Sequence, residues 1–367
     1  MKENKQAVDG ILLFAICALL IIGVIMVYSA SAAWGEYRFS DPYHFAKRQL
    51  LFAGAGCVGM LFMMRFGYWR WRNYVLTTVL VCFALLILVL IPGIGLIRGG
   101  AQSWIGVGAF SIQPSEFMKL GMILFLAHWL ARNQQQITRF RTGMLPLLAI
   151  IFTAFALIML QPDLGTGAVM VATSFIMLFI AGAKKAHFAW LGTIGAVGFV
   201  GLIASAPYRI DRITSFFDPW NDPLGSGFQI IQSLYAIGPG GLFGMGFGES
   251  RQKYFYLPEP QTDFIFAVIA EEGGFIAGVV VILLFAVIMW RGLRTALLAP
   301  DLFGTLLAVG IIGMLFVQVM INIGVVIGLF PVTGITLPLL SYGGSSLTLM
   351  LLALGILLNI SAHTRVT

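Results

Sequence analysis

The chain has 367 residues, of which 59% are hydrophobic and 10% are charged, and its formal net charge is +7. This composition excludes a soluble globular domain built around one core and is typical of a polytopic membrane protein. Runs of about 20 apolar residues favour spanning helices over the roughly 10-residue alternating strands of a membrane barrel, so the predicted fold class is all-α.

Ten apolar runs predict ten membrane-spanning helices in a single domain over residues 1–367. They are 11–28, 48–64, 74–92, 116–131, 144–160, 166–182, 187–205, 264–290, 304–328 and 345–361. Arginine and lysine gather in alternate short loops, which predicts that these loops are cytoplasmic. Lys2, Lys5 and Arg365 fall on the same side, so both termini are expected in the cytoplasm. The basic excess therefore indicates topology in the cytoplasmic membrane and not affinity for nucleic acid.

The beginning of the chain allows two interpretations. A basic start and the apolar run Ile11–Val27 are followed by Tyr28–Ala33, whose small residues resemble a signal-peptidase site. We interpret this segment as a first helix that stays in the protein.

Two adjacent cations, Lys47 and Arg48, stand at the outer edge of the second predicted span. Such side chains can reach lipid headgroups while their stems stay in the apolar layer. Two neighbouring cations at this depth would equally suit a pyrophosphate group. Both interpretations stay open, and Arg48 is a candidate substrate-binding residue.

Glu116 and Lys119 open the fourth predicted span and share one helix face, since they are three residues apart. Pairing would lower the cost of holding either charge at low dielectric, so the pair has a structural or a substrate-binding role. Pro114 suits the first helical position if Gln113 is the cap, whereas Ser115 is the better capping residue by type.

Asp163 lies in a tight turn between the fifth and sixth predicted spans. It is expected either to cap the following helix or to bind a ligand.

The longest polar segment is a predicted extracytoplasmic loop over residues 206–263, between the seventh and eighth spans. Within it, Phe228–Ala236 is expected to form a short amphipathic helix at the interface, with Gln229, Gln232 and Ser233 on its polar side. The loop ends at Asp263, where partial desolvation should raise the pKa of the carboxyl group toward values useful in a general base.

Two other patterns argue against nucleotide chemistry, and a third leaves a role open. Asp218 and Asp222 do not form the Asp-x-Asp pair of a metal-dependent sugar-nucleotide transferase, so a nucleotide-sugar donor is disfavoured. Six glycines between Gly238 and Gly248 lack the flanking strand and helix of a nucleotide-binding loop, and we expect them to pack against the membrane surface. Glu271 and Glu272 are expected to be buried about 12 Å below Asp263 if the helix is regular. They have a role either in helix packing or in lining a polar cavity.

The last predicted span opens with Ser341–Ser346, whose small residues and hydroxyls are expected to face the external cavity. Ser345 in this run is a candidate substrate-binding residue.

Several long motifs follow one another in a characteristic order. They are KRQLLFAG at 47–54, QPSEFMKL at 113–120, QPDLGTG at 161–167, DPLGSGFQIIQS at 222–233, LPEPQTDFIFAVIAEE at 257–272 and LPLLSYGGSS at 337–346. Through them nearly the whole chain resembles the SEDS family (shape, elongation, division and sporulation). The YSASAAW and SWIGVGAFSIQPSEFMKL runs are similar to its sporulation branch, with the cell-division branch next.

The resemblance implies a ten-helix peptidoglycan glycosyltransferase that polymerises lipid II, an undecaprenyl-pyrophosphate-linked disaccharide pentapeptide, beside a class B penicillin-binding transpeptidase. It implies that Asp263 matches the essential aspartate of the family, and that Glu116 and Lys119 match its Glu/Lys pair. Arg48, Asp163 and Arg212 also fall on motif positions. Ser103 departs from the pattern, because some elongation-branch members have arginine there.

On this hypothesis Asp263 accepts the proton of the acceptor sugar's 4-hydroxyl as that oxygen attacks the donor's anomeric carbon, with inversion. Arg48, Lys119 and Arg212 would neutralise the leaving pyrophosphate, and a divalent cation, Mg²⁺ or Mn²⁺, stays an open option. No other cofactor is expected.

Two alternatives use the same residues differently. A flippase for lipid II would need ionisable residues that reach both faces of the membrane. A scaffold that recruits the transpeptidase would need no chemistry at Asp263.

Overall fold

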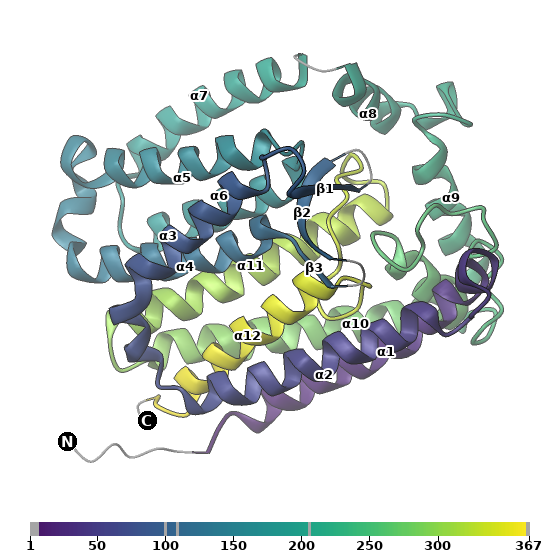
Figure 1. The fold of residues 1–367 in the computed structure, drawn as a ribbon, viewed down its shortest axis with the longest axis horizontal. Helices are drawn as coiled ribbons and strands as arrows, with labels where there is room; N and C mark the ends of the chain where they lie inside the picture. The colour runs from purple at the N-terminus through teal and green to yellow at the C-terminus, as the bar shows by residue number, and fades with distance from the viewer. Residues whose placement is uncertain (1–6, 99–100, 108–109, 205–206, 365–367) are drawn as a thin grey trace.

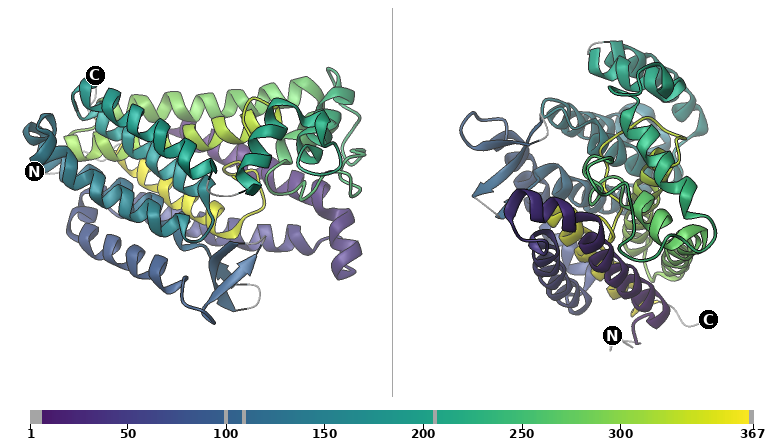
Figure 2. Two further views of the ribbon diagram at one scale, coloured as in Figure 1. Left: turned by 90° about the horizontal axis from the view of Figure 1, so that it is seen from above. Right: turned by 90° about the vertical axis from the view of Figure 1, so that its right-hand side faces the viewer.

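The computed structural model describes residues 7–98, 101–107, 110–204 and 207–364. Ten helices cover the ten predicted spans, and the boundaries differ by a few residues except where helices continue beyond the apolar run. They are α1 (Gly10–Phe39), α2 (His44–Arg65), α3 (Trp71–Leu88), α4 (Pro114–Arg132), α5 (Leu145–Met159), α6 (Leu164–Ile180), α7 (Lys185–Ala204), α10 (Ile265–Leu298), α11 (Leu302–Val326) and α12 (Gly344–Ser361). The helices run side by side as one elongated bundle (Figures 1 and 2).

Six helical segments of the described chain are by themselves long and apolar enough to cross a membrane. They are Gly10–Phe39, Tyr68–Leu88, Phe140–Met159, Ile265–Leu298, Leu302–Val326 and Gly344–Ser361, and Leu164–Ile180 is a shorter apolar helix. The protein is therefore a multi-pass membrane protein.

The most deeply buried of these segments are α11 and α12, with 72% and 78% of their most apolar stretches inside the protein. Glycine allows α12 to lie directly against α2. A Cβ atom at Gly355 would lie 2.7 Å from the carbonyl oxygen of Met60, and one at Gly56 would meet the side chain of Leu351. Small residues at such crossings let helices in a membrane approach closely.

The first and last helices meet at one end of the bundle. The backbone N–H of Asp9 donates to Ser361 Oγ over 3.2 Å, and the Asp9 carboxylate pairs with Arg291 of α10 over 2.6 Å. The two ends of the helical chain therefore lie on the same side, as an even number of spans requires. The terminal Lys2, Lys5 and Arg365 lie outside the described residues.

The connection between α3 and α4 contains a small antiparallel sheet, so the protein is nearly, but not entirely, helical. Its strands are β1 (Gly95–Arg98), β2 (Ala101–Val107) and β3 (Phe110–Ile112), in the order β1-β2-β3. Ser103 of β2 is buried and donates to the carbonyl oxygen of Gln161 over 3.0 Å. The sheet is thereby attached to the turn before α6.

The long segment between α7 and α10 holds two helices, α8 (Pro207–Phe217) and α9 (Phe228–Gly240), beside one end of the bundle (Figure 1). The predicted helix at Phe228–Ala236 is confirmed. The assignment of Ser233 to its exposed polar side is wrong, because Ser233 is buried and donates to the carbonyl oxygen of Val326 over 2.7 Å.

Helix α10 is broken at Gly274, where the backbone has φ 68° and ψ −167°. The free carbonyl oxygens of Glu271 and Glu272 accept hydrogen bonds from the amides of Met245 and Gly246, over 2.9 and 3.0 Å. The freed amides of Phe275 and Ile276 donate to the carbonyl oxygens of Gly241 and Leu242, over 2.8 and 3.2 Å. Residues 241–246 are thus inserted into the break and satisfy its backbone groups, as an apolar environment demands.

This insertion explains the cluster of glycines. The backbone at Gly244 has φ +80°, and a Cβ atom there would collide with the carbonyl oxygen of Glu272. At Gly240 a Cβ atom would collide with the carbonyl oxygen of Ala270. The predicted close packing exists at these two positions, but its partner is the backbone of α10.

Candidate functional site

The chain just before α10 is held in place by three consecutive carbonyl oxygens. Gln261 O accepts from the amide of Tyr342 over 2.8 Å, and Thr262 O accepts from Ser341 Oγ over 2.6 Å. Asp263 O accepts from Asn322 Nδ2 over 2.7 Å. These donors belong to α11 and to the loop at 329–343, so Asp263 is positioned by segments far from it in the sequence.

The side chain of Asp263 lies beside the same loop. A Cβ atom at Gly334, whose φ is +75°, would lie 3.7 Å from Asp263 Oδ2, which is ordinary contact. Burial raises the pKa of Asp263 to about 7, the negative charge of Glu259 adds to the rise, and Arg212 opposes it. A carboxylate with a pKa near the operating pH is suited to general-base catalysis.

Arg212 of α8 also lies against this loop. Its Nη1 donates to the carbonyl oxygen of Val332 over 3.0 Å. Because the same residue opposes the pKa rise of Asp263, its positive charge acts on the carboxylate. The structure thus brings two of the predicted site residues, Asp263 and Arg212, to one place.

A second polar cluster forms around Asp163 at the start of α6. Its Oδ1 accepts from the amide of Thr166 over 3.1 Å, which confirms that Asp163 caps this helix. Its Oδ2 accepts from Gln113 Nε2 over 2.8 Å and from Ser115 Oγ over 3.0 Å. Gln113 is the N-cap residue of α4 and Pro114 its first residue, so the alternative with Ser115 as cap is wrong.

Glu116 and Lys119 form the expected ion pair on α4. The distance from Lys119 Nζ to Glu116 Oε1 is 2.9 Å, and both side chains are buried. Ser345 at the start of α12 accepts from the amide of Gln113 over 3.0 Å, one turn before this pair. The hydroxyl of Ser345 is therefore engaged in joining α12 to α4.

The two clusters meet at residues 333–336. A Cβ atom at Gly165 of α6 would lie 2.9 Å from the carbonyl oxygen of Thr333, and one at Gly334 would lie 3.7 Å from Asp263 Oδ2. Thr336 Oγ1 donates to Ser346 Oγ of α12 over 3.2 Å. This segment thus lies between Asp263 on one side and the elements that carry Asp163 and Ser345 on the other.

Arg48 is half-buried on α2 and forms no salt bridge with any residue in the described part of the chain. The next residue, Gln49, is buried and donates to the carbonyl oxygen of Ser341 over 3.1 Å. Lys47 is exposed and pairs with Asp41 over 2.8 Å. The two adjacent cations therefore differ in their surroundings. Lys47 is engaged by Asp41, whereas Arg48 is followed by Gln49, which is bound to the loop that holds Asp263.

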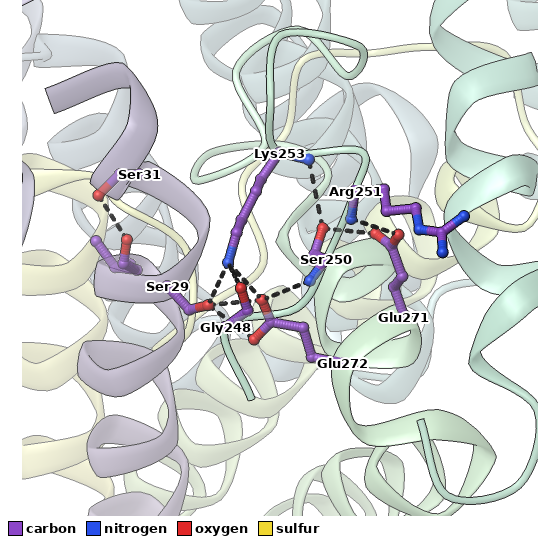
Figure 3. A network of polar contacts seen from close by, with 9 residues as sticks. Ser29, Ser31, Gly248, Ser250, Arg251, Lys253, Glu271 and Glu272 are labelled. Atoms are coloured by element: carbon purple, nitrogen blue, oxygen red, sulfur yellow. Dashed lines mark hydrogen bonds and ion pairs between the residues drawn. The ribbon is translucent and has the colours of Figure 1, made fainter. Parts of the chain in front are cut away.

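Glu271 and Glu272 belong to a separate buried network (Figure 3). Glu272 accepts from Ser29 Oγ over 2.6 Å and pairs with Lys253 Nζ over 3.0 Å. Glu271 accepts from Ser250 Oγ over 2.6 Å and from the amide of Arg251 over 2.8 Å. Both carboxylates thus attach the loop at 248–253 to α10, and Glu272 also joins α1, which favours the packing role over an open polar cavity.

Sequence reasoning missed the residues that hold the candidates in place. Asn322 and Lys253 are both buried, one inside an apolar helix and the other in a loop. A polar amide in the apolar run VQVMINIG was the available signal for Asn322, because such groups need partners in a membrane. Lys253 offered no local signal, since its partner Glu272 follows 19 residues later.

Within the described ranges, no group of three or more His, Cys, Asp or Glu side chains is placed to hold a metal ion. A site of the kind Mg²⁺ often uses, with one or two carboxylates completed by substrate phosphates, needs fewer protein ligands.

The fold and site define a polytopic helical membrane protein with a half-buried acid just before the start of a spanning helix. The family described as "Cell cycle protein" (FTSW_RODA_SPOVE) matches residues 10–366. The chain belongs to this family.

Two curated relatives match essentially end to end. The chain is 65% identical over 365 residues to "Stage V sporulation protein E" of Bacillus subtilis (strain 168), with 100% of both chains covered. It is 45% identical over 354 residues to "Probable peptidoglycan glycosyltransferase FtsW" of Trichlorobacter lovleyi, covering 96% of this chain and 93% of that one.

Solved structures of similar proteins agree with the assignment of the chain to this family. A chain from a study of "Structural coordination of polymerization and crosslinking by a peptidoglycan synthase complex" is 34% identical, with a TM-score of 0.80 over 97% of this chain and 98% of the other. The rod shape determining protein RodA of Thermus thermophilus is 31% identical, with a TM-score of 0.72 over 97% of each chain.

Proposed function

We propose that this protein is a peptidoglycan glycosyltransferase that polymerises lipid II on the outer face of the cytoplasmic membrane, for spore cortex or septal wall. The proposal is supported by the family, by relatives named as such enzymes, and by the fold. The observation that carries the chemistry is Asp263, an acid whose pKa is raised to about 7 and which ends a run of three residues, 261–263, whose carbonyl oxygens each accept a hydrogen bond.

In the proposed reaction the Asp263 carboxylate takes the proton of the acceptor sugar's 4-hydroxyl. That oxygen forms a bond to the donor's anomeric carbon, and the bond from this carbon to the pyrophosphate oxygen breaks with its electron pair. The anomeric carbon inverts and undecaprenyl pyrophosphate leaves. A single general base with a pKa near 7 suffices for this displacement.

The leaving pyrophosphate needs positive charge, and the candidates are Arg48, Lys119 and Arg212. Lys119 is buried and engaged by Glu116, so it would act as part of a pair. A divalent cation, Mg²⁺ or Mn²⁺, that arrives with the pyrophosphate would add to this charge. Asp163 and Ser345 are proposed to shape the same region from α6 and α12.

The proposed topology places both helix ends of the chain in the cytoplasm and the segment 206–263 outside, above the outer leaflet. Membrane lipids surround the bundle. The proposed partner is a class B penicillin-binding transpeptidase, and the solved relative from a complex that coordinates polymerization and crosslinking supports it.

The test is glycan synthesis from purified lipid II by the purified protein with its cognate transpeptidase in detergent. A detergent solution has no two compartments, so a flippase cannot produce a signal there. Glycan polymer from the pair, and none from the transpeptidase alone, is the expected result. Absence of polymer, with a known polymerase active in the same assay, would favour the flippase or the scaffold.

A further inference from the structure

A cavity of about 380 Å³ opens in the extramembrane part of the protein, between α8, the start of α9 and the loop at 329–343. Its walls include Arg212, Ser226, Phe228, Gln229 and Val332. None of its lining residues belongs to a helix that spans the bundle. A ligand in this cavity would therefore sit above the membrane surface.

The cavity adjoins the Asp263 site through shared residues. Arg212 lines the cavity and donates to the carbonyl oxygen of Val332, which lines it too. Gly334, two residues after Val332, lies beside the Asp263 carboxylate, since a Cβ atom there would be 3.7 Å from Asp263 Oδ2. A chain that leaves the reacting centre along this wall would enter the cavity directly.

The chemistry of the lining favours a neutral polar ligand. Asp211 and Arg212 both line the cavity, so a polyanion lying inside it would meet a carboxylate as well as the guanidinium that is proposed to serve the pyrophosphate beside Asp263. Ser226 and Gln229 offer hydroxyl and amide groups, which can both donate and accept. Phe228 supplies a half-buried aromatic surface.

We propose that this cavity is a subsite for an N-acetylated amino sugar of the growing glycan strand, adjacent to the reacting sugar at Asp263. This inference rests on the proposed function. The amide of Gln229 would pair with the acetamido group, and the Phe228 ring would pack against the sugar's C–H face. The volume lies at the lower end of the range for small-molecule sites, about 300–1,000 Å³, and so suits about one or two sugar rings.

The consequence is control of strand length. After each transfer the strand must be kept near Asp263 while the next lipid II arrives. A sugar held in the cavity would retain the strand through that interval, because the cavity lies outside the membrane and beside the base. Weakening the subsite would release shorter strands.

The test uses two readouts, and the first does not depend on catalysis. Binding of tetra-N-acetylchitotetraose to the full-length protein is measured directly, and the length distribution of glycan made from lipid II is measured by gel. The variant is Gln229→Leu, which keeps the side chain's size and removes its amide. The matched control is Gln232→Leu, one turn later on α9, half-buried and not part of the cavity wall.

We expect Gln229→Leu to weaken binding of the tetrasaccharide about fivefold, the effect of losing one hydrogen-bonding group of about 1 kcal/mol. Its glycan strands should be shorter than those of the wild type, and Gln232→Leu should change neither readout. Wild-type strand lengths in Gln229→Leu, or failure of the wild type to bind the tetrasaccharide while it polymerises lipid II, would overturn the subsite. Binding that responds to Gln229→Leu in a protein that makes no polymer would instead overturn the proposed function.

Discussion

The side-chain amide of Asn322 holds two backbone carbonyl oxygens at once, Asp263 O and Ile335 O, each over 2.7 Å. It thereby fixes the start of α10 against the loop at 329–343. Asn322 is buried within the apolar helix α11, and both acceptors depend on its single NH₂ group.

Replacing Asn322 with leucine should misplace Asp263. Two carbonyl oxygens would lose their donor, at a cost of about 1–3 kcal/mol for each buried group. We expect a lower melting temperature in detergent and a fall in kcat for polymerisation. The control is Gln318→Leu, one turn earlier on α11, where the buried side-chain oxygen has no partner in the described structure. If both variants behave alike, Asn322 has no special positioning role.

The pKa of Asp263 predicts a pH dependence. A general base must be deprotonated, so kcat/KM should rise with pH and level off above about 7, where the carboxyl group has lost its proton. The negative charge of Glu259 raises this pKa, so Glu259→Gln should move the midpoint to lower pH.

Glu249→Gln is the control for this shift, because Glu249 is equally exposed and is not among the charges that act on Asp263. A flat profile between pH 5 and 8 would argue against Asp263 as the titrating base. A midpoint that moves to higher pH in Glu259→Gln would contradict the assigned electrostatics.

The ion pair between Lys253 and Glu272 should matter for stability. Lys253→Met would leave the buried Glu272 carboxylate without its cation, and breaking a buried pair in this way costs about 3–5 kcal/mol. The double variant Lys253→Met/Glu272→Gln should recover part of the loss, since no buried charge is then unpaired. Thermal melting in detergent measures both.

Lys47→Met serves as the comparison, because it breaks an exposed pair with Asp41 and should change the melting temperature little. Equal effects of Lys253→Met and Lys47→Met would show that the buried network contributes nothing beyond a surface pair.

Gly244→Ala should disrupt the insertion of residues 241–246 into α10, because its Cβ atom would collide with the carbonyl oxygen of Glu272. Gly248→Ala separates this collision from backbone strain. Gly248 has a similar φ of +84°, and nothing lies within 4 Å of its Cβ position. We expect Gly248→Ala to cost about 1–2 kcal/mol from the left-handed backbone alone, and Gly244→Ala to lose more. Similar melting temperatures for the two would argue against a close insertion.

The sequence predicted the helices well because each apolar run is a continuous stretch of sequence. In a membrane such a stretch must satisfy its own backbone hydrogen bonds, which a helix does. It predicted the Glu116–Lys119 pair, and it gave capping as one of two roles for Asp163, for the same reason, since the partners lie within a turn. The sheet formed by β1, β2 and β3 was missed because its strands lack a clear alternation of apolar and polar residues.

What could not be predicted depends on partners far apart in the chain. Ser29 and Glu272 are 243 residues apart, and Asn322 and Asp263 are 59 apart. Nothing in either local segment identifies the other. The break in α10 was also hidden, because Gly273 and Gly274 in an apolar run are compatible with an intact helix until the inserted loop is known.

The most direct test of the account is a single-turnover measurement of glycosyl transfer with Asp263→Asn in the complex with its transpeptidase. Asparagine keeps the size of the side chain and the backbone carbonyl that Asn322 holds, so folding and lipid II binding should match the wild type. The account predicts a fall in rate of at least about 100-fold, the lower bound for loss of a general base. A rate within a few-fold of the wild type, with folding and binding intact, would contradict the assignment of Asp263 as the catalytic base.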